Sequence, residues 1–163
     1  QDTLSADLEA LFQLHNQRWQ QANVTGVFAK RPNIVDFYRT FAPIALSNKQ
    51  LRLYTLSIKG QVCAAQIGYV YKQSFFAIQE GFDPKVEKGI GQVLRLYAFN
   101  QAYQEELTCY DFLGVYTDHK RRWLAECHKG HHVFIVKPSL KNIFFRFGLI
   151  WPTGRYFNIN NDE

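Results

Sequence analysis

FFAIQEGFDPKVEKGIGQVL, residues 75–94, is the stretch that decides the fold: an apolar segment, a charged loop, and then Gly-Ile-Gly. Aromatic and β-branched residues up to Phe82 predict a strand, which Asp83 and Pro84 bring to an end. Apolar residues at helical spacing across positions 93–107 predict a helix beyond the loop. The stretch therefore predicts a strand that leads directly to the N-terminus of a helix.

Two glycines, Gly89 and Gly91, stand where this helix is predicted to begin. A glycine has no Cβ, so the backbone N–H groups around it can approach an anion closely, and the helix dipole adds to the attraction. The stretch therefore predicts a phosphate site, with an ordinary strand-to-helix turn as the alternative. It is neither a P-loop, which needs Gly-Lys-Ser/Thr, nor a dinucleotide fingerprint, which needs a third glycine.

The segment from Pro84 to Leu94 resembles the pyrophosphate-binding loop of the GNAT acyltransferases. The resemblance implies an α/β (α+β) fold with a mixed central sheet and helices on both faces, and acetyl-CoA or another acyl-CoA as co-substrate. One position differs, because the family usually has Arg or Gln where this chain has Val86. The residues that the resemblance assigns to the cofactor are Phe82, Lys85, Lys88, Gly89, Ile90, Gly91 and Gln92.

Two further motifs resemble the CelD-like acetyltransferases of bacterial cellulose and exopolysaccharide clusters. They are Tyr110-Asp111-Phe112-Leu113-Gly114 and Asp118-His119-Lys120-Arg121-Arg122-Trp123, with His119 where that branch usually has Tyr. Residues 15–19 and 26–28 match the start of the same domain. The resemblance implies that Arg18, Trp19 and Lys120 bind the acceptor, and it relates the chain to the Fem aminoacyltransferases.

Length and composition limit the possible architectures. A chain of 163 residues that is 47% hydrophobic predicts one domain over 1–163, because two would each lack a sizeable core. Because the sequence begins at Gln1 and holds no Met, we expect it to be the C-terminal part of a longer protein whose N-terminal half is missing.

Charge and cysteine usage narrow the partners and the compartment. A net charge of +5 suits an anionic ligand and is too dispersed to indicate DNA. Three cysteines without framework spacing predict free thiols and a cytoplasmic protein. We expect no transmembrane segment, since no apolar run is long enough to span a bilayer.

The remaining periodicities predict the other elements of the fold. Helices are expected over 4–19 and 34–45, covering one face of a sheet. Strands are expected over 51–58 and 62–71, with a third ending at Phe82, and a parallel strand over 109–116 after the central helix. Asp118 is expected to cap a short helix to about Cys127, followed by a strand over 132–137 and a helix over 139–150.

Acyl transfer from a thioester to an amine needs a base for the amine and an acid for the departing thiolate. We predict Glu80 as the base because it is the only carboxylate of its strand, and the apolar neighbours Ile78 and Phe82 would suit it to proton transfer near neutral pH. The alternative is a solvated residue near the strand end. Tyr116 is the predicted acid, with His119 as an alternative. The resemblance places pantetheine along Ile78–Phe82, with a backbone N–H near Phe82 polarising the thioester.

Other site chemistries receive less support. Cys127, His128, His131 and His132 gather around a Lys-Gly turn without zinc spacing, so no metal is expected. The chain contains no Gly-x-Ser-x-Gly motif, which excludes the usual serine hydrolase elbow. A solvated helix face is the simplest interpretation of Arg121 and Arg122, and a core position is the simplest alternative for Trp19.

Three functions remain open from the sequence. The first is an acyl-CoA-dependent N-acetyltransferase acting on a small amine, such as an amino sugar in polysaccharide metabolism. The second is a Fem-like transferase that uses aminoacyl-tRNA, for which Lys120-Arg121-Arg122 could begin a basic surface. The third is a non-catalytic module that keeps the fold and binds a partner or nucleotide, which Val86 and His119 would favour.

Overall fold

The computed structural model of the chain describes residues 3–86 and 88–129. It divides into two compact units, Gln1–Leu124 and Ala125–Glu163. Every element given below belongs to the first unit. The strand expected over 132–137 and the helix over 139–150 lie outside the described residues, and the single domain over 1–163 stays a prediction.

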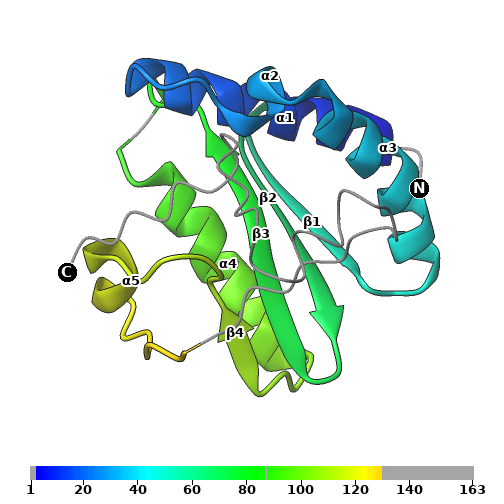
Figure 1. The fold of residues 1–163 in the computed structure, drawn as a ribbon, viewed down its shortest axis with the longest axis vertical. Helices are drawn as coiled ribbons and strands as arrows, with labels where there is room; N and C mark the ends of the chain where they lie inside the picture. The colour runs from blue at the N-terminus through cyan, green and yellow to red at the C-terminus, as the bar shows by residue number, and fades with distance from the viewer. Residues whose placement is uncertain (1–2, 87, 130–163) are drawn as a thin grey trace, which may run out of the picture. The chain divides into compact units, whose positions relative to one another are not determined.

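The first unit is a mixed sheet with helices on both faces, as the sequence predicted (Figure 1). The strands lie side by side in the order β1-β2-β3-β4; β1, β2 and β3 are antiparallel, and β4 is parallel to β3. None of the helices in the described part of the chain is both long enough and apolar enough to cross a membrane. The elements are α1 Leu4–Gln21, α2 Val27–Lys30, α3 Pro32–Ser47, β1 Leu51–Ile58, β2 Gln61–Tyr71, β3 Ser74–Phe82, α4 Ile90–Gln104, β4 Cys109–Asp111 and α5 Asp118–Arg122.

Helices α1 to α3 cover one face of the sheet. Their buried residues include Leu11 and Ala42, which pack with Ile67 of β2 in one hydrophobic cluster. Where α1 crosses β3, the strand has Gly81, whose Cβ, if present, would lie 2.3 Å from the backbone N of His15. Glycine is required there because helix and strand backbones touch, and this contact brings the last turns of α1 over the second half of β3.

Helix α4 covers the opposite face. Its residues Ile90 and Leu94 pack against Cys63 and Ala64 of β2 in a second hydrophobic cluster. Val86, in the loop before α4, packs against the same cluster, so its side chain turns toward apolar neighbours. The loop is thereby held close to the C-terminal end of β3.

Strand β4 is shorter than predicted, and the expected strand over 109–116 is wrong beyond Asp111. It pairs with β3 only from Ser74↔Cys109 to Phe76↔Asp111. The backbone then adopts positive φ at Leu113 (51°) and Gly114 (62°), which a continuing strand cannot do. From Ala77 onward, the edge of β3 that faces away from β2 therefore pairs with no strand in the described residues.

Two helices also differ from the prediction. A one-turn helix, α2, forms between the two helices predicted over 4–19 and 34–45, directly before Pro32 starts α3. Helix α5 ends at Arg122 because Leu124 adopts φ 58°, and the cap position is Thr117 rather than Asp118. Asp118 is the first helical residue and pairs with Arg121 at 3.1 Å.

Candidate active site

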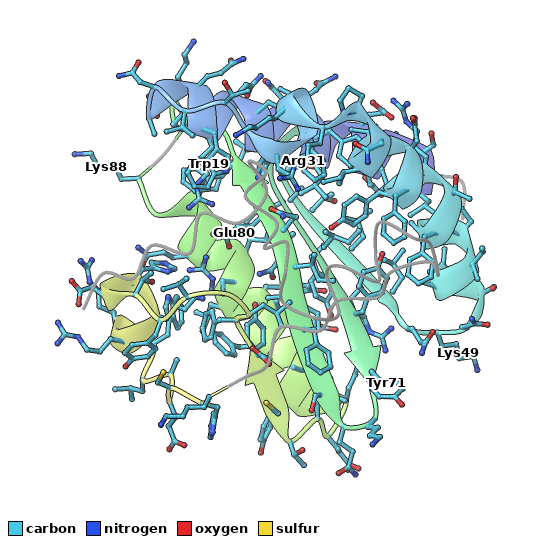
Figure 2. The ribbon with its side chains drawn as sticks, viewed as in Figure 1. Trp19, Arg31, Lys49, Tyr71, Glu80 and Lys88 are labelled. Atoms are coloured by element: carbon cyan, nitrogen blue, oxygen red, sulfur yellow. The ribbon has the colours of Figure 1, made fainter. Side chains whose placement is uncertain are left out.

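A cavity of about 200 Å³ opens along the free edge of β3. It brings together side chains from four elements and from the segment after β4, positions that are far apart in the sequence. Trp19 of α1 and Glu80 of β3 lie near one another in this region (Figure 2). The lining residues are His15, Arg18, Trp19, Gln66, Ala77, Ile78, Gln79, Glu80, Arg95, Phe112, His119 and Lys120.

Glu80 is held between two arginines in this cavity. Arg18 Nη1 donates to one carboxylate oxygen at 2.9 Å, and Arg95 Nη2 donates to the other. The apolar surroundings expected for Glu80 are therefore wrong, because its nearest charged groups are two guanidiniums. Glu80 is nevertheless not simply solvated, since its side chain is only 25% exposed and lines the cavity.

Arg95 is a member of the site that the sequence analysis missed. Its side chain is 5% exposed, and besides Glu80 it donates from Nη1 to His119 Nε2 at 2.8 Å. A sequence signal existed, because Arg95 falls on the stripe of α4 that also buries Leu94, Ala98 and Ala102. A charged residue on a buried helical stripe needs a partner of opposite charge, and here that partner is Glu80.

His119 occupies the position where the CelD-like motif usually has Tyr. An arginine can only donate, so His119 Nε2 accepts from Arg95 and the neutral ring carries its proton on Nδ1. Burial, together with the neighbouring Arg95 charge, lowers the pKa of His119 below its usual value. His119 is therefore neutral at pH 7 and has its basic nitrogen already in use, which disfavours it as the acid.

His15 and Trp19 form one wall of the cavity. Trp19 Nε1 donates to His15 Nε2 at 3.0 Å, which fixes the indole relative to α1. Burial lowers the pKa of His15, so this ring is also neutral. Trp19 is 38% exposed and lines the cavity, so the core position considered for it is wrong.

Gln66 lies opposite Glu80 in the register of β2 and β3. Its side-chain Nε2 donates to the Tyr110 hydroxyl at 2.9 Å, and burial raises the pKa of Tyr110. The other end of the amide, Oε1, is buried without a hydrogen-bond partner in the described structure. Gln66 was not predicted as a site residue, because a single glutamine in an apolar strand belongs to no motif.

Two of the predicted site residues, Lys120 and Tyr116, are not bonded to Glu80. Lys120 lines the cavity, but its ammonium donates to the carbonyl oxygens of Leu113 and, at 2.6 Å, Val115. Tyr116 is 41% exposed and is not among the residues that line the cavity. The reason is that β4 ends at Asp111, so Tyr116 does not stand at a strand end.

The predicted phosphate loop lies at the N-terminus of α4. Gly89 adopts φ 89°, and a Cβ there would meet nothing within 4 Å, so the space next to this backbone is open. Gly91 is different, because a Cβ there would lie only 2.8 Å from the Phe82 ring. Close packing against this ring is by itself enough to require glycine at position 91. Lys85 and Lys88 are exposed, and Lys88 points outward (Figure 2). The N–H of Gln92 already donates to the Gly89 carbonyl oxygen at 2.7 Å. Of the predicted set, the N–H groups before it, at Gly89, Ile90 and Gly91, are therefore the ones available to an anion.

The structure also places some of the possible metal ligands and the cysteines. No group of three or more His, Cys, Asp or Glu within 3–86 and 88–129 is arranged to hold a metal ion. Cys63 is buried, whereas Cys109 and Cys127 are exposed, and all three are free thiols. His131 and His132 lie outside the described residues.

The chain is similar to known proteins in sequence and in fold. A family model described as acetyltransferase (GNAT) domain matches residues 1–121. No curated protein is similar enough in sequence to match the chain.

Several solved structures share the fold. A possible acetyltransferase from Clostridium difficile 630 has a TM-score of 0.60 at 11% identity, covering 82% of this chain and 93% of that one. The PaiA N-acetyltransferase of Thermoplasma acidophilum, in complex with coenzyme A, has a TM-score of 0.52 at 14% identity, covering 64% and 71%. A GNAT family acetyltransferase from Brucella melitensis, in complex with acetyl-CoA, has a TM-score of 0.50 at 18% identity, covering 72% and 75%. Because the family model spans 121 of the 163 residues, the chain belongs to the GNAT family of acetyltransferases.

Proposed function

We propose that this domain transfers an acetyl group from acetyl-CoA to the primary amine of a small acceptor. One observation carries the proposal: the edge of β3 that pairs with no strand in the described residues lines the cavity from Ala77 to Glu80, and the loop that follows Phe82 leads to Gly89 at the start of α4. An unpaired strand edge offers backbone N–H and C=O groups to an extended ligand, and a helix N-terminus offers N–H groups to phosphates. One extended ligand would use both.

Coenzyme A fits this surface in one orientation. Its pyrophosphate would lie against the N–H groups of Gly89, Ile90 and Gly91, because that of Gln92 is bonded to the Gly89 carbonyl. Its pantetheine would lie along Ile78–Phe82 as an added strand. A backbone N–H near Phe82 would then polarise the thioester carbonyl. One structural neighbour is a complex with coenzyme A and another a complex with acetyl-CoA, which supports the choice of ligand. Val86 faces the core, so we assign any side-chain contribution to Lys85 and Lys88.

The chemical step joins the acceptor nitrogen to the acetyl carbonyl carbon while the carbon–sulfur bond breaks. The amine loses one proton, and the coenzyme A thiolate gains one. Glu80 is the proposed proton acceptor, because it is the one carboxylate among the lining residues and each of its oxygens has a second lone pair besides the one that accepts from an arginine. In both histidine rings the single acceptor nitrogen is already used. Tyr116 stays a prediction as the acid, and water can protonate the thiolate where Tyr116 does not reach it.

The finer predictions from the resemblance remain proposals. Amino sugars, polysaccharide metabolism and the CelD-like branch are supported by the sequence motifs alone, and the cytoplasm by the cysteine usage alone. The Fem-like alternative needs an extended basic surface. On α5, however, Lys120 is bonded to backbone carbonyls and Arg121 to Asp118, which leaves less free charge there than the sequence suggested.

Turnover is the direct test of the proposal. The chain is incubated with acetyl-CoA and a panel of primary amines, including glucosamine, while released thiol and acetylated product are measured together. Equal amounts of thiol and N-acetyl product are the expected result. Binding of acetyl-CoA without any product across the panel would favour the non-catalytic module instead.

A further inference from the structure

The cavity contains a hydrogen-bond acceptor that nothing in the described structure uses. Gln66 is 2% exposed, and its Oε1 has no partner, while its Nε2 is anchored to Tyr110 at 2.9 Å. A buried unpaired carbonyl is costly, and it becomes satisfied when a ligand supplies an N–H group. Because Gln66 and Glu80 are directly opposed in antiparallel strands, their Cβ atoms are about 5 Å apart, close enough for one amine nitrogen to contact both side chains.

The cavity also contains a cation with unused donors. Arg18 donates to Glu80 through Nη1, and its Nε and Nη2 have no hydrogen-bond partner among the described residues. Its guanidinium lies 4.8 Å from the Phe82 ring centre, and its side chain is 33% exposed. The planar fork of an arginine matches a carboxylate or phosphate, which accepts two parallel hydrogen bonds.

The charges that line the cavity do not balance. Arg18, Arg95 and Lys120 contribute three positive charges and Glu80 one negative charge, which leaves +2 with both histidines neutral. A simple ammonium ion would enter this field unfavourably, whereas an acceptor with its own anionic group would be attracted. The same positive field favours the neutral, nucleophilic form of the amine.

We propose that the acceptor is a small amine that carries a carboxylate or phosphate near its nitrogen, with Gln66 Oε1 accepting from the amine and Arg18 binding the anion. This proposal rests on the proposed function and names the acceptor class of the same site. Arg18 is bonded to Glu80, the carboxylate proposed to take the proton of the amine. The amine and the anionic group must therefore lie close together in the acceptor. Free glycine-like amino acids and aminoalkyl or amino-sugar phosphates have this arrangement.

The test compares three probes that share a short primary amine: glycine, O-phosphoethanolamine and ethanolamine. Binding is measured by ligand-observed NMR in low-chloride buffer, with the chain alone and with coenzyme A added. We expect at least one anionic probe to bind ten-fold or more tightly than ethanolamine, and the tighter of the two identifies carboxylate or phosphate as the anion. Equal or tighter binding of ethanolamine would overturn the proposal.

Variants at Arg18 and Gln66 test separately how the anionic end and the amine end of the acceptor are recognised. Arg18→Gln is expected to reduce the preference for the anionic probe to below three-fold, because the anion loses its partner while ethanolamine meets one positive charge fewer and binds at least as well as before. Arg121→Gln, which removes the same charge from an exposed side chain, should keep the full preference. If Arg121→Gln lowers the preference as much as Arg18→Gln does, overall charge and not Arg18 recognises the anion.

Gln66→Leu is expected to weaken all three probes by a similar factor, about ten-fold, because it acts at the amine end. If this variant does not fold, Gln66→Glu keeps an acceptor oxygen at the same place. Gln66→Glu should then bind ethanolamine at least as well as the wild type and the anionic probes less well. Unchanged binding of every probe to the Gln66 variant that folds would contradict the assigned role.

Binding of these probes does not depend on acetyl transfer, so the two proposals fail separately. If acetylated product is absent but the anionic probes are preferred, the acceptor site stands and the proposed function fails. If ethanolamine is acetylated and binds best, the proposed function stands and the anionic acceptor fails.

Discussion

At the scale of single residues, the central feature is a carboxylate shared by two arginines. Arg95 has a side chain that is 5% exposed and relies on Glu80 for its opposite charge. Removing one partner of a buried pair leaves the other charge uncompensated, so Glu80 contributes to the stability of the fold as well as to the cavity. Replacing Glu80 is therefore predicted to have a measurable cost in stability.

Glu80→Gln is predicted to lower turnover by about two to four orders of magnitude, the usual effect of removing one general base. Turnover should recover partly as the pH rises, because more of the amine then arrives already deprotonated. The same variant should lose about 1–3 kcal/mol of unfolding free energy, since both ion pairs disappear while Glu80 is only partly buried.

Glu80→Asp serves as the matched control, because it keeps a carboxylate in the cavity. It should retain more activity than Glu80→Gln and show no extra recovery at high pH. If Glu80→Gln turns over like the wild type at every pH while its stability falls, Glu80 only holds the arginines and another group takes the proton.

The neutral state of His15 predicts how stability depends on pH. Because burial lowers its pKa below the ordinary value of 6.5, the unfolded chain binds a proton at His15 more readily than the folded chain. The stability that this difference provides is present above pH 6.5 and is lost as the pH falls below it. Urea unfolding should therefore show decreasing stability between pH 7.5 and 5.5, with a smaller decrease in His15→Gln. Equal pH dependence in both proteins would contradict a neutral, buried His15.

At the scale of secondary-structure elements, the segment after β4 determines how many residues of β3 are paired on that edge. Lys120 donates to the carbonyls of Leu113 and Val115, and this clamp holds a turn with two positive φ values where a strand was expected. The turn directs the chain away from β3 and so leaves the strand edge free. Lys120 therefore shapes the cavity, and its third ammonium hydrogen remains available to an acceptor.

Lys120→Ala is predicted to raise the KM for the acceptor, because the turn and one donor are lost, while coenzyme A affinity stays unchanged. Steady-state kinetics with calorimetry on the same samples would separate the two effects. Arg122→Ala, on the same short helix and exposed, is the control and should alter neither quantity. Loss of coenzyme A affinity in Lys120→Ala would contradict the assignment to the acceptor side.

The elements that the sequence predicted well are those with a strong local signal. Strands β1 to β3 alternate or run apolar between clear turns, and their observed bounds differ from the prediction by at most one residue where a bound was given. The segment after Asp111 was misjudged because Phe112, Val115 and Tyr116 are typical strand residues. The positive φ at Leu113 is stabilised by Lys120, seven positions later, which local propensity does not report.

The candidate site was partly predictable because some of its residues also carry a local sequence signal. Arg18, Trp19, Glu80 and Lys120 were identified by motif or charge, and the structure brings all four to one cavity. Gln66 and Arg95 were missed, since neither belongs to a motif and their roles depend on contacts between strands and helices. The partners of Glu80 lie 62 and 15 positions away along the chain, so only the assembled fold could reveal them.

At the scale of the whole molecule, the proposed function needs two parts of the domain, the acceptor cavity and the glycine loop before α4. The cavity is lined by the edge of β3 from Ala77 to Glu80, which is unpaired in the described residues because β4 pairs with only three residues of β3. We propose that coenzyme A lies along this edge. Binding of coenzyme A is therefore the claim on which the proposed function and its chemistry depend.

Calorimetric titration of coenzyme A into three proteins tests that claim most directly. Gly89→Val places a side chain in the open space at φ 89°, whereas Gly60→Val imposes the same kind of strain at φ 81° in the open turn between β1 and β2. We predict that wild type and Gly60→Val bind with similar affinity and that Gly89→Val loses at least ten-fold. No binding to the wild type at millimolar coenzyme A, or unchanged binding to Gly89→Val, would contradict the account.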